Sequence, residues 1–437
     1  MRLFGKSQFF TLVHEKANEH PIIIYGAGMD AVWAIEEWTQ YYHKPFYGCV
    51  CDGDIKKQQM LIDGVQIVSP VDALQKYPNA YIWVAAKDYK FEIIGKLILE
   101  MSIEKTRILN YEPIIKKEGC RYAEKMFFAF EQNIPDKRLK RIIHICDRIG
   151  NCPTISFHGY DGFYKEFIGF RDTVIDSIER TGGHEACQSC NEIRESYFAV
   201  SRKLRTYNLA TDGHCNFRCI YCNAPIFSPR RPEDQNEIFD FRKILEIFDK
   251  NNLLSEELHM DLTSGEICVN PRRREMLDVA AEYGETVSIA TNASVYDEQL
   301  FRILDSKRAS IIVSMDAGTE NTFLRIKQRD YYGKVCDNLL AYGKAGRGAV
   351  ELKYIVLPGV NDNLMDIDGF IDLCKRVQPG IVTISFDFYH QGEIPPQTFD
   401  VINRLKVGLV ENGFFYKYEA RASHILKQSD KGLEYDG

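Results

Sequence analysis

Three cysteines lie close together in the stretch CNFRCIYC, where Cys215, Cys219 and Cys222 have the spacing C-x3-C-x2-C. Thiolates on one short loop can converge on a single metal centre. A [4Fe-4S] cluster has four irons, so three cysteine ligands leave one iron open to a further ligand. The alternatives are a zinc site with His214 as fourth ligand, or redox thiols. The spacing favours the cluster.

That spacing, with an aromatic residue before the last cysteine, resembles the signature of the radical S-adenosylmethionine (SAM) superfamily. Short motifs that also resemble this family follow in order within residues 205–392. The resemblance implies the SAM-binding residues Tyr221, Ser264, Gly265, Glu266, Asn292, Ser314, Asp316, Lys327 and Tyr354. Each motif is weak by itself, but their order and spacing behind the cysteines make the joint signal strong.

The resemblance gives each motif an expected role. The TSGE turn (263–266) is similar to the glycine–glycine–glutamate motif that holds the amino group of SAM, with serine replacing the first glycine. ATN (290–292) resembles the strand end that contacts the SAM ribose and carboxylate, and Lys327 stands where relatives often carry an arginine for that carboxylate. YIVLPGVND (354–362) resembles the strand lining the adenine, with Tyr221 beside it.

The chemistry that the resemblance implies is reductive. An electron enters the cluster, the sulfonium C–S bond of SAM breaks, and a 5'-deoxyadenosyl radical removes a hydrogen atom from an unactivated carbon of the substrate. The protein supplies orientation and exclusion of water, while the cofactor supplies the hard chemistry. The expected electron donor is a flavodoxin- or ferredoxin-type protein.

A second group of cysteines lies upstream and comprises Cys146, Cys152, Cys187 and Cys190. A separated cysteine followed by C-x2-C resembles the auxiliary-cluster modules called SPASM and twitch domains, here placed before residues 205–392. The resemblance implies a second [4Fe-4S] cluster, with Cys120 as an alternative ligand. The other interpretations are a zinc site of four thiolates, or a buried helix position for Cys146 with only the last two cysteines paired.

The remaining cysteines have simpler interpretations. Cys268 follows the TSGE turn and is either a hydrogen-atom donor facing SAM or a small core residue. Cys336 and Cys374 fall in helical patterns, while Cys49 and Cys51 alternate along a predicted strand and so share one face. We expect these four to be packing residues.

A glycine-rich turn opens the N-terminal part of the chain. Gly26 and Gly28 lie between a predicted strand and a helix, an arrangement that lets a phosphate approach a helix N-terminus. Asp52 or Asp54 follows the next strand, roughly where a ribose-binding acid belongs. This region resembles small Rossmann-like domains attached to sugar-modifying acyltransferases and methyltransferases, which implies nucleotide or nucleotide-sugar binding. The alternative is a structural or docking domain.

Strand and helix patterns divide the chain into four parts and predict an α/β protein. Residues 1–115 alternate strands and helices and predict a Rossmann-like parallel sheet. Residues 116–204 form a cysteine-bearing bridge, in which we expect a helix over 120–150. Residues 205–392 repeat strand and helix, which predicts a partial (β/α)6-type barrel with its site at the strand ends. Residues 393–437 form a C-terminal extension.

Composition and charge exclude several classes of protein. The net charge of -7 argues against general binding of nucleic acid or anionic membranes. No apolar run is long enough to cross a bilayer, and the first residues lack the pattern of a signal peptide. We therefore expect a cytoplasmic protein, whose thirteen cysteines serve metal binding or catalysis before disulfides.

The predicted function is hydrogen-atom abstraction from a sugar, nucleotide-sugar or glycan-precursor substrate, with the substrate class based on the N-terminal part alone. Candidate substrate contacts near the open mouth of the barrel are Asp387, Tyr389, His390 and Glu393, of which we expect one or two to act. One alternative is a radical SAM maturase that modifies peptides or proteins. The other is a non-catalytic Fe–S sensor of redox state or ligand.

Overall fold

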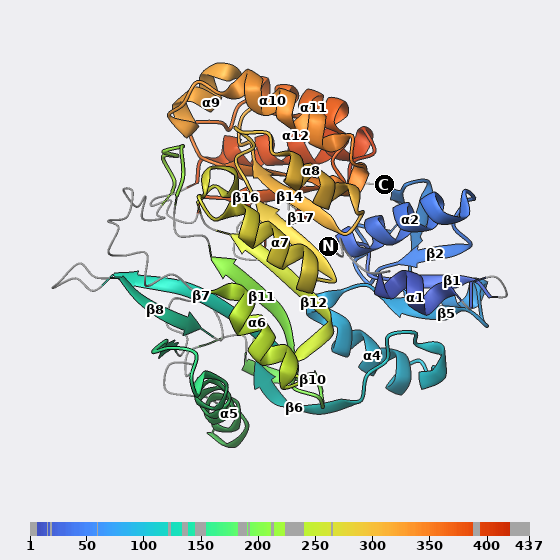
Figure 1. Cartoon of the computed structure of the whole chain (residues 1–437). Helices are drawn as coiled ribbons and strands as arrows, with labels where there is room; N and C mark the ends of the chain where they lie inside the picture. Colours follow the sequence, from blue (N-terminus) through green and yellow to red (C-terminus); the bar gives the residue numbers. More distant parts are fainter. Residues whose placement is uncertain are drawn as a thin grey trace.

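The structure is a computed structural model built on two mainly parallel sheets (Figure 1). It describes residues 7–14, 16–17, 20–58, 60–120, 124–132, 139–144, 154–181, 190, 193–210, 214–222, 240–263, 265–387 and 394–419. Across these residues, no helix combines the length and the apolar character needed to cross a bilayer.

The N-terminal sheet has five strands in the order β3-β4-β2-β1-β5. Its elements are α1 (Gln8–His14), β1 (Ile22–Tyr25), α2 (Met29–Tyr42), β2 (Gly48–Cys51), β3 (Leu61–Ile62), β4 (Val65–Val68), α3 (Pro70–Lys76), β5 (Tyr81–Val84) and α4 (Lys90–Leu99). All pairs are parallel except β3 with β4. From β1 the chain first adds β2 on one side and later returns to add β5 on the other side of β1. This arrangement confirms the predicted strand–helix alternation.

Both faces of this sheet are covered by helices. The side chains of β1 alternate between two separate apolar cores, with Ile22 and Ile24 in one and Ile23 and Tyr25 in the other. This explains why the short run is continuously apolar rather than alternating. Cys49 and Cys51 belong to the same core, so the interpretation of these thiols as packing residues is confirmed.

A second, larger sheet contains the predicted barrel. Its six central strands are β11 (Leu204–Ala210), β12 (Leu254–Thr263), β13 (Thr286–Ala290), β14 (Ala309–Ser314), β15 (Val350–Val356) and β16 (Ile381–Phe386). The helices between them are α6 (Phe241–Lys250), α7 (Arg273–Tyr283), α8 (Glu298–Asp305), α9 (Glu320–Lys327), α10 (Tyr332–Gly343) and α11 (Leu364–Val377). Neighbouring strands are parallel and follow chain order. Their C-terminal ends therefore meet at one edge, as a partial barrel requires.

Further strands lengthen this sheet at both edges. At one edge, α12 (Pro396–Glu411) leads to β17 (Tyr416–Tyr418), which pairs with β16. At the other edge, β7 (Lys125–Gln132) pairs parallel with β11 and is followed by antiparallel β8 (Leu139–His144) and β9 (Thr154–Ser156). The helix α5 (Phe163–Thr181) and a ribbon of β6 (Ile114–Cys120) with β10 (Ile193–Ala199) complete the bridge.

The helix predicted over residues 120–150 is wrong. The stretch KMFFAFEQ becomes β7 instead, and a hairpin follows it. A short apolar run does not distinguish a buried helix from a strand by periodicity, while its aromatic residues favour a strand. The edge of β11 provides the backbone partners that decide between the two.

The N-terminal domain packs against the end of the barrel where the strands begin. Trp33 on α2 donates its indole N–H to the Gly348 carbonyl at 3.0 Å, just before β15. Lys87, which follows β5, reaches the Thr286 hydroxyl at the start of β13 and lies 3.3 Å from His259 Nδ1. Asp30 pairs with this lysine at 3.0 Å. The N-terminal domain therefore closes the end of the barrel opposite to the strand ends (Figure 1).

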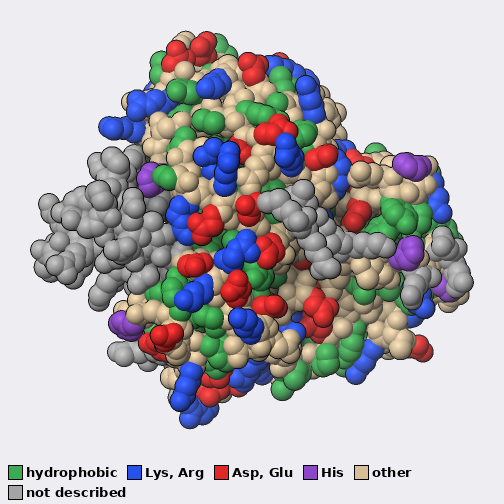
Figure 2. Space-filling model, in the orientation of Figure 1, with side chains coloured by type: hydrophobic (Ala, Val, Ile, Leu, Met, Phe, Trp, Pro, Cys, Tyr) green, Lys and Arg blue, Asp and Glu red, His purple; other side chains and the backbone are tan. Residues whose placement is uncertain are grey.

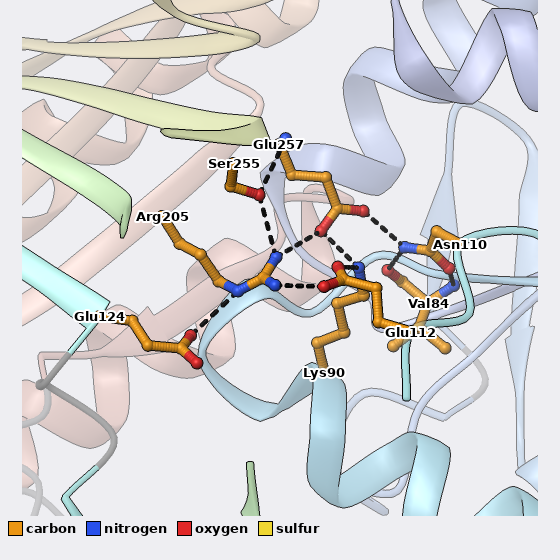
Figure 3. A network of polar contacts seen from close by, with 8 residues as sticks. All are labelled: Val84, Lys90, Asn110, Glu112, Glu124, Arg205, Ser255 and Glu257. Carbon is orange, nitrogen blue, oxygen red and sulfur yellow. Dashed lines mark hydrogen bonds and ion pairs between the residues drawn. The ribbon is translucent and has the colours of Figure 1, made fainter. Parts of the chain in front are cut away.

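A buried ionic network joins the N-terminal domain, the bridge and the first barrel strands (Figure 3). Lys90 on α4 pairs with Glu112 at 2.9 Å and also with Glu257 on β12. Arg205 on β11 contacts both of these carboxylates, and its Nε lies 3.0 Å from Glu124. Burial alone would raise the pKa of Glu112, but Lys90 and Arg205 hold it below its ordinary value. A buried charge is stable only beside its counter-charge, so the network fixes the N-terminal domain, the bridge and the barrel relative to one another.

Glu36 provides a test of the domain contact. Its carboxylate accepts the backbone N–H groups of Arg347 and Gly348 across the interface, the latter at 3.1 Å. Replacing Glu36 by alanine leaves both donors without a partner, which lowers the free energy of unfolding by about 1–3 kcal/mol. Urea denaturation measures the change against Glu411→Ala, an exposed glutamate at the end of α12. Equal stability of the two variants would contradict this view of the interface.

Candidate functional site

The three cysteines of the predicted cluster site lie on one loop (214–222) after β11. This loop packs on the C-terminal end of α9, where Arg218 N–H donates to the Lys327 carbonyl at 3.3 Å and Ile220 N–H to the Ile326 carbonyl at 3.0 Å. A helix end leaves carbonyls without intrahelical donors, and the loop supplies them. Cys215 and Cys219 are half-buried, and Cys222 is exposed. The loop therefore presents its thiols from a supported position.

The thiols are close enough to affect one another electrostatically. Burial raises the pKa of Cys215 and Cys219, and the neighbouring cysteines raise both further, while Lys327 opposes the shift at Cys219. Two N–H donors approach Cys215 Sγ, the Phe217 backbone at 3.4 Å and Asn292 Nδ2 at 3.9 Å. Donors of this kind tune thiolate ligands of Fe–S clusters.

The donor set suits an Fe–S cluster, because its three members are all thiols on one loop. In the described part of the chain, no three His, Cys, Asp or Glu side chains form a group that could hold one metal ion. A four-iron cube binds each thiolate through a different iron, so its ligand sulfurs stay farther apart than those around one ion.

A buried polar triad locks the cluster loop onto the strand ends. Tyr221 donates its hydroxyl to Asp316 Oδ2 at 2.6 Å, and Lys327 Nζ contacts both this carboxylate and the Tyr221 oxygen, the latter at 2.7 Å. Asp316 Oδ1 accepts the Ile355 N–H at 2.8 Å. Asp316 and Lys327 are 0% and 2% exposed, so each charge depends on the other. The Lys327 ammonium is thus already paired, and its predicted contact with the SAM carboxylate stays a prediction.

Glu266 ties the ends of β12 and β13 together. Its buried carboxylate accepts the Thr291 hydroxyl at 2.7 Å, the Cys268 N–H at 3.0 Å and the Asn292 N–H. Burial raises its pKa, while these donors oppose the shift. Gly265 has a φ of +65°, which glycine adopts without strain and which places the glutamate beneath the turn. The adjoining Ser264 lies outside the described residues.

Asn292 connects this strand end to the cluster loop. Its Nδ2 donates to Asn216 Oδ1 at 2.8 Å, and Asn216 donates in turn to the Ser294 hydroxyl at 2.8 Å. Asn216, which the sequence analysis did not select, is thus a second link between loop and barrel. Ser314 is half-buried at the end of β14. The structure therefore gathers most of the predicted SAM-binding positions around the three cysteines.

Two predicted site residues point elsewhere. Tyr354 lies on the helix-facing side of β15, where its ring packs 4.8 Å from Phe370 and its hydroxyl donates to the Asn361 carbonyl at 2.8 Å. Strand alternation turns it away from the inner face, so the structure does not support its expected place beside the adenine. Cys268 is buried in the same helix-side core as Cys336 and Cys374, and burial raises its pKa. This position favours packing over hydrogen-atom donation.

The structure describes only one of the four cysteines predicted to bind an auxiliary cluster. Cys146, Cys152 and Cys187 lie outside the described residues, as do Tyr389, His390 and Glu393. Cys190 is half-buried and lies three residues before Ile193, which pairs with Cys120 across the β6–β10 ribbon. A second cluster in this region stays a prediction.

The N-terminal glycine turn lies far from the cluster loop, in the domain at the strand-start end. Gly26 has a φ of +115°, and a Cβ there would meet the Ala86 Cβ at 2.9 Å, so backbone shape alone requires glycine. Asp52 accepts the Ala27 N–H at 2.8 Å and pairs with Lys57 at 3.0 Å. The expected ribose-binding acid thus already holds the turn. Gly28 leaves open space, and nucleotide binding stays a prediction.

The inner face of the barrel is unusually polar. Apolar residues such as Met260 and Leu262 on β12 face the helices, which places their strand neighbours on the opposite face. By strand register this inner face carries Thr206, Asn208, His259, Asp261, Thr263, Thr286, Ser288, Ser310, Ser314, Glu351, Lys353, Thr383 and Ser385, together with the apolar residues Ala290, Ile312, Ile355 and Ile381. The alternation in HMDLT, VELKY and IVTIS was the signal that could have revealed these positions.

The polar groups of the inner face use part of their hydrogen-bonding capacity on one another. Asn208 Nδ2 lies 3.3 Å from Asp261 Oδ2 and 2.9 Å from Thr263 Oγ1. Burial raises the pKa of Asp261 to about 6, with Lys125 opposing the shift. Glu351 pairs with Lys417 of β17 at 3.0 Å. Among the described residues, the buried Ser385 hydroxyl has no hydrogen-bond partner. A buried hydroxyl in this state is available to a ligand.

Comparison with known proteins identifies the central part of the chain. Residues 212–371 match the model of the Radical SAM superfamily. The chain is 22% identical over 177 residues to GTP 3',8-cyclase of Petrotoga mobilis, covering 39% of this chain and 52% of that protein. It is 28% identical over 152 residues to GTP 3',8-cyclase of Gloeobacter violaceus, covering 34% and 46%. The chain thus spans about half the length of these relatives.

Solved structures of radical SAM enzymes give a weaker likeness. SuiB of Streptococcus suis, bound to the precursor peptide SuiA, matches with a TM-score of 0.41 and 12% identity, covering 73% of this chain and 75% of that one. The part of the chain that carries the cysteine loop, residues 212–371, is therefore similar to radical SAM proteins. The cofactors of this superfamily are a [4Fe-4S] cluster and SAM, and Cys215, Cys219 and Cys222 supply thiolates of the kind that bind such a cluster.

The buried triad makes a testable prediction about stability. Asp316→Asn keeps the shape and the left-handed backbone (φ +57°) but leaves the Lys327 ammonium buried without a counter-charge. The free energy of unfolding should fall by about 3–5 kcal/mol, as expected for a broken buried ion pair. Adding Lys327→Met removes the unpaired charge and should restore most of the loss. Urea denaturation measures both variants, and a double variant no more stable than Asp316→Asn would refute the coupling.

Proposed function

We propose that this radical SAM enzyme removes a hydrogen atom from a hydroxyl-rich substrate, namely a sugar, a nucleotide-linked sugar or a glycan precursor. The observation that carries the proposal is the polar inner face of the barrel, where hydroxyl, amide and carboxylate groups line the strands below the cluster loop. The polar inner face thus replaces the N-terminal domain as the main support for a sugar substrate.

The proposed cofactor-binding residues lie at neighbouring strand ends. Cys215, Cys219 and Cys222 would hold the cluster, and Asn292, whose Nδ2 lies 3.9 Å from Cys215 Sγ, and Gly265 would bind SAM beside it. When bound, the cluster supplies the electron that breaks the sulfonium C–S bond of SAM. The protein's own residues hold the loop in place and keep the strand ends in register, so that SAM and substrate meet in one orientation.

Hydroxyl-rich substrates suit the inner face because each hydroxyl both donates and accepts a hydrogen bond. Asp261 and Glu351 can accept hydrogen bonds from substrate hydroxyls in addition to those that they already accept, and the buried Ser385 hydroxyl, which has no partner among the described residues, can donate to a substrate oxygen. An apolar substrate would leave the Ser385 hydroxyl without a partner, at a cost of about 1–3 kcal/mol. A site built to hydrogen-bond a hydroxyl therefore rejects an analogue that lacks it.

The names of the relatives support a substrate that contains a nucleotide. The matched proteins of Petrotoga mobilis and Gloeobacter violaceus are GTP 3',8-cyclases, and GTP combines a sugar with a base and phosphates. A nucleotide-linked sugar shares these chemical groups. The electron donor that we propose for the reaction is a flavodoxin- or ferredoxin-type protein.

The cluster assignment is tested by Cys219→Ala. Because three thiolates must bind three irons, the variant should hold about four irons per chain fewer than wild type after anaerobic reconstitution and form no 5'-deoxyadenosine from SAM and dithionite. Cys374→Ala removes a buried thiol from α11 and serves as the matched control. Wild-type protein should hold about four irons per chain, or about eight if the upstream cysteines bind a second cluster. Iron retention and 5'-deoxyadenosine formation by Cys219→Ala would reject the assignment.

The substrate class is tested through Asp261. With its pKa raised to about 6, this carboxyl is ionised at pH 7 and becomes protonated as the pH falls to 5. A hydroxyl donates more strongly to the ionised form, so the Kd of a nucleotide sugar that stimulates SAM cleavage should rise over this range. Asp261→Asn should bind it roughly tenfold more weakly at pH 7, about 1.4 kcal/mol, with little pH dependence.

A panel of substrates distinguishes the sugar-modifying, peptide-modifying and sensor hypotheses. Nucleotide sugars and peptides are compared for stimulation of 5'-deoxyadenosine formation by the full chain. Stimulation by peptides alone would contradict the sugar proposal and support a peptide-modifying enzyme. Absence of any SAM cleavage under reducing conditions would support the non-catalytic sensor.

A further inference from the structure

We propose that Asn216 is a positioning residue that aims an N–H of Asn292 at the Cys215 sulfur and thereby sets the reduction potential of the cluster bound there. The inference rests on the proposed function, because it requires a cluster on Cys215, Cys219 and Cys222. Hydrogen bonds to ligand sulfurs are one of the means by which proteins adjust the potential of an Fe–S cluster. Asn216 therefore acts through Asn292 and not on the irons.

The hydrogen bonds fix which end of each side-chain amide faces the other. The Ser294 backbone N–H can only donate, and it lies 2.9 Å from the Asn292 amide, so this contact must be made by Oδ1. Asn292 Nδ2 therefore points the other way, 2.8 Å from Asn216 Oδ1 and 3.9 Å from Cys215 Sγ. An amide nitrogen carries two protons, so one serves Asn216 and the other serves the sulfur.

Asn216 is itself held at its side chain and at its backbone. Its Oδ1 accepts from Asn292, so its Nδ2 faces the Ser294 hydroxyl, to which it donates at 2.8 Å. Ser294 is 0% exposed, so this anchor lies inside the protein. The Asn216 carbonyl accepts Nε of Arg329 at 3.0 Å. A residue bound at both places has little freedom, and Asn216 can therefore restrain the Asn292 amide.

The turn that carries Asn292 has an unfavourable backbone conformation. Ala293 has a φ of +54°, which is uncommon for a residue with a Cβ. Such a residue persists only where its surroundings hold it, and residues of this kind cluster at functional sites. The Ala293 N–H donates to the Thr291 hydroxyl at 3.1 Å, and its carbonyl accepts Nδ2 of Asn338 on α10 at 2.8 Å. The structure thus maintains a strained turn in which Asn292 faces the cluster loop.

The direction of the effect follows from charge. One added electron increases the negative charge that a cluster shares with its sulfur ligands. An N–H donor stabilises the more negative state more strongly, so a donor at Cys215 raises the reduction potential. In this step the reductant loses one electron and the cluster gains it, and no bond forms or breaks. Asn292 Oδ1 keeps a second lone pair, so the role is compatible with the proposed contact between Asn292 and SAM.

The test measures the reduction potential without SAM or substrate. The reconstituted full chain is titrated anaerobically with dithionite and redox mediators, and electron paramagnetic resonance reports the reduced cluster. Cys219→Ala identifies which signal belongs to this loop. Asn216→Ala and Asn292→Ala should each move the midpoint to a more negative value, because each loses the aimed donor. At one fixed potential, the ratio of reduced to oxidised cluster should fall roughly threefold to tenfold.

Asn251→Ala is the matched control. Asn251 is an exposed residue directly after α6, and its side chain contacts only the helix carbonyl of Ile247 among the described residues. Figure 2 shows acidic and basic side chains interspersed over the face that carries α6, so the loss of one neutral amide there should not change the field at the cluster. This variant should keep the wild-type midpoint.

A double variant separates positioning from a general loss of structure. If Asn216 acts only through Asn292, the double alanine variant should have the same midpoint as Asn292→Ala. If Asn216→Ala fails to bind the cluster, Ser294→Ala removes only the hydroxyl that anchors Asn216 and should shift the midpoint in the same direction. An unchanged midpoint in these variants, or additive shifts in the double variant, would overturn the positioning role alone. Wild-type protein that binds no cluster on this loop would contradict the proposed function together with this inference.

Discussion

The buried contact between Asp316, Lys327 and Tyr221 is the interaction on which the site depends. It joins the end of β14, the last turn of α9 and the cluster loop, and Asp316 also holds the Ile355 N–H of β15. Neither charge is stable alone in an environment that excludes water. The three segments must therefore assemble together, and the position of the thiols follows from that assembly.

Much of the fold was predictable because strand–helix alternation is a local pattern with one favoured arrangement. Parallel strands end at a common edge, so motifs after successive strands, such as Glu266, Asn292 and Asp316, had to meet there. Predictions failed where the outcome depends on distant partners. The stretch after Cys120 became β7 because the edge of β11 was open, and Tyr354 turned outward because the register of β15 was decided by its helix-side packing.

Different parts of the chain cover the two ends of the barrel. Loops at the strand ends carry the cysteines, whereas the N-terminal domain contacts residues at the strand starts through Trp33, Glu36 and Lys87. A ligand at the Gly26 turn would lie on the far side of the barrel from the thiols. Any influence of that ligand on the reaction would have to pass through the strands or through the ionic network around Arg205.

The position of Lys87 at the strand-start end of the barrel bears on where ligands can enter and leave. Lys87, backed by Asp30, occupies that end of the barrel and contacts Thr286 and His259 there. The N-terminal domain thus covers the strand-start end of the barrel. A ligand bound on the inner face would have to enter and leave at the end that carries the cysteines, or past the open edges of the sheet.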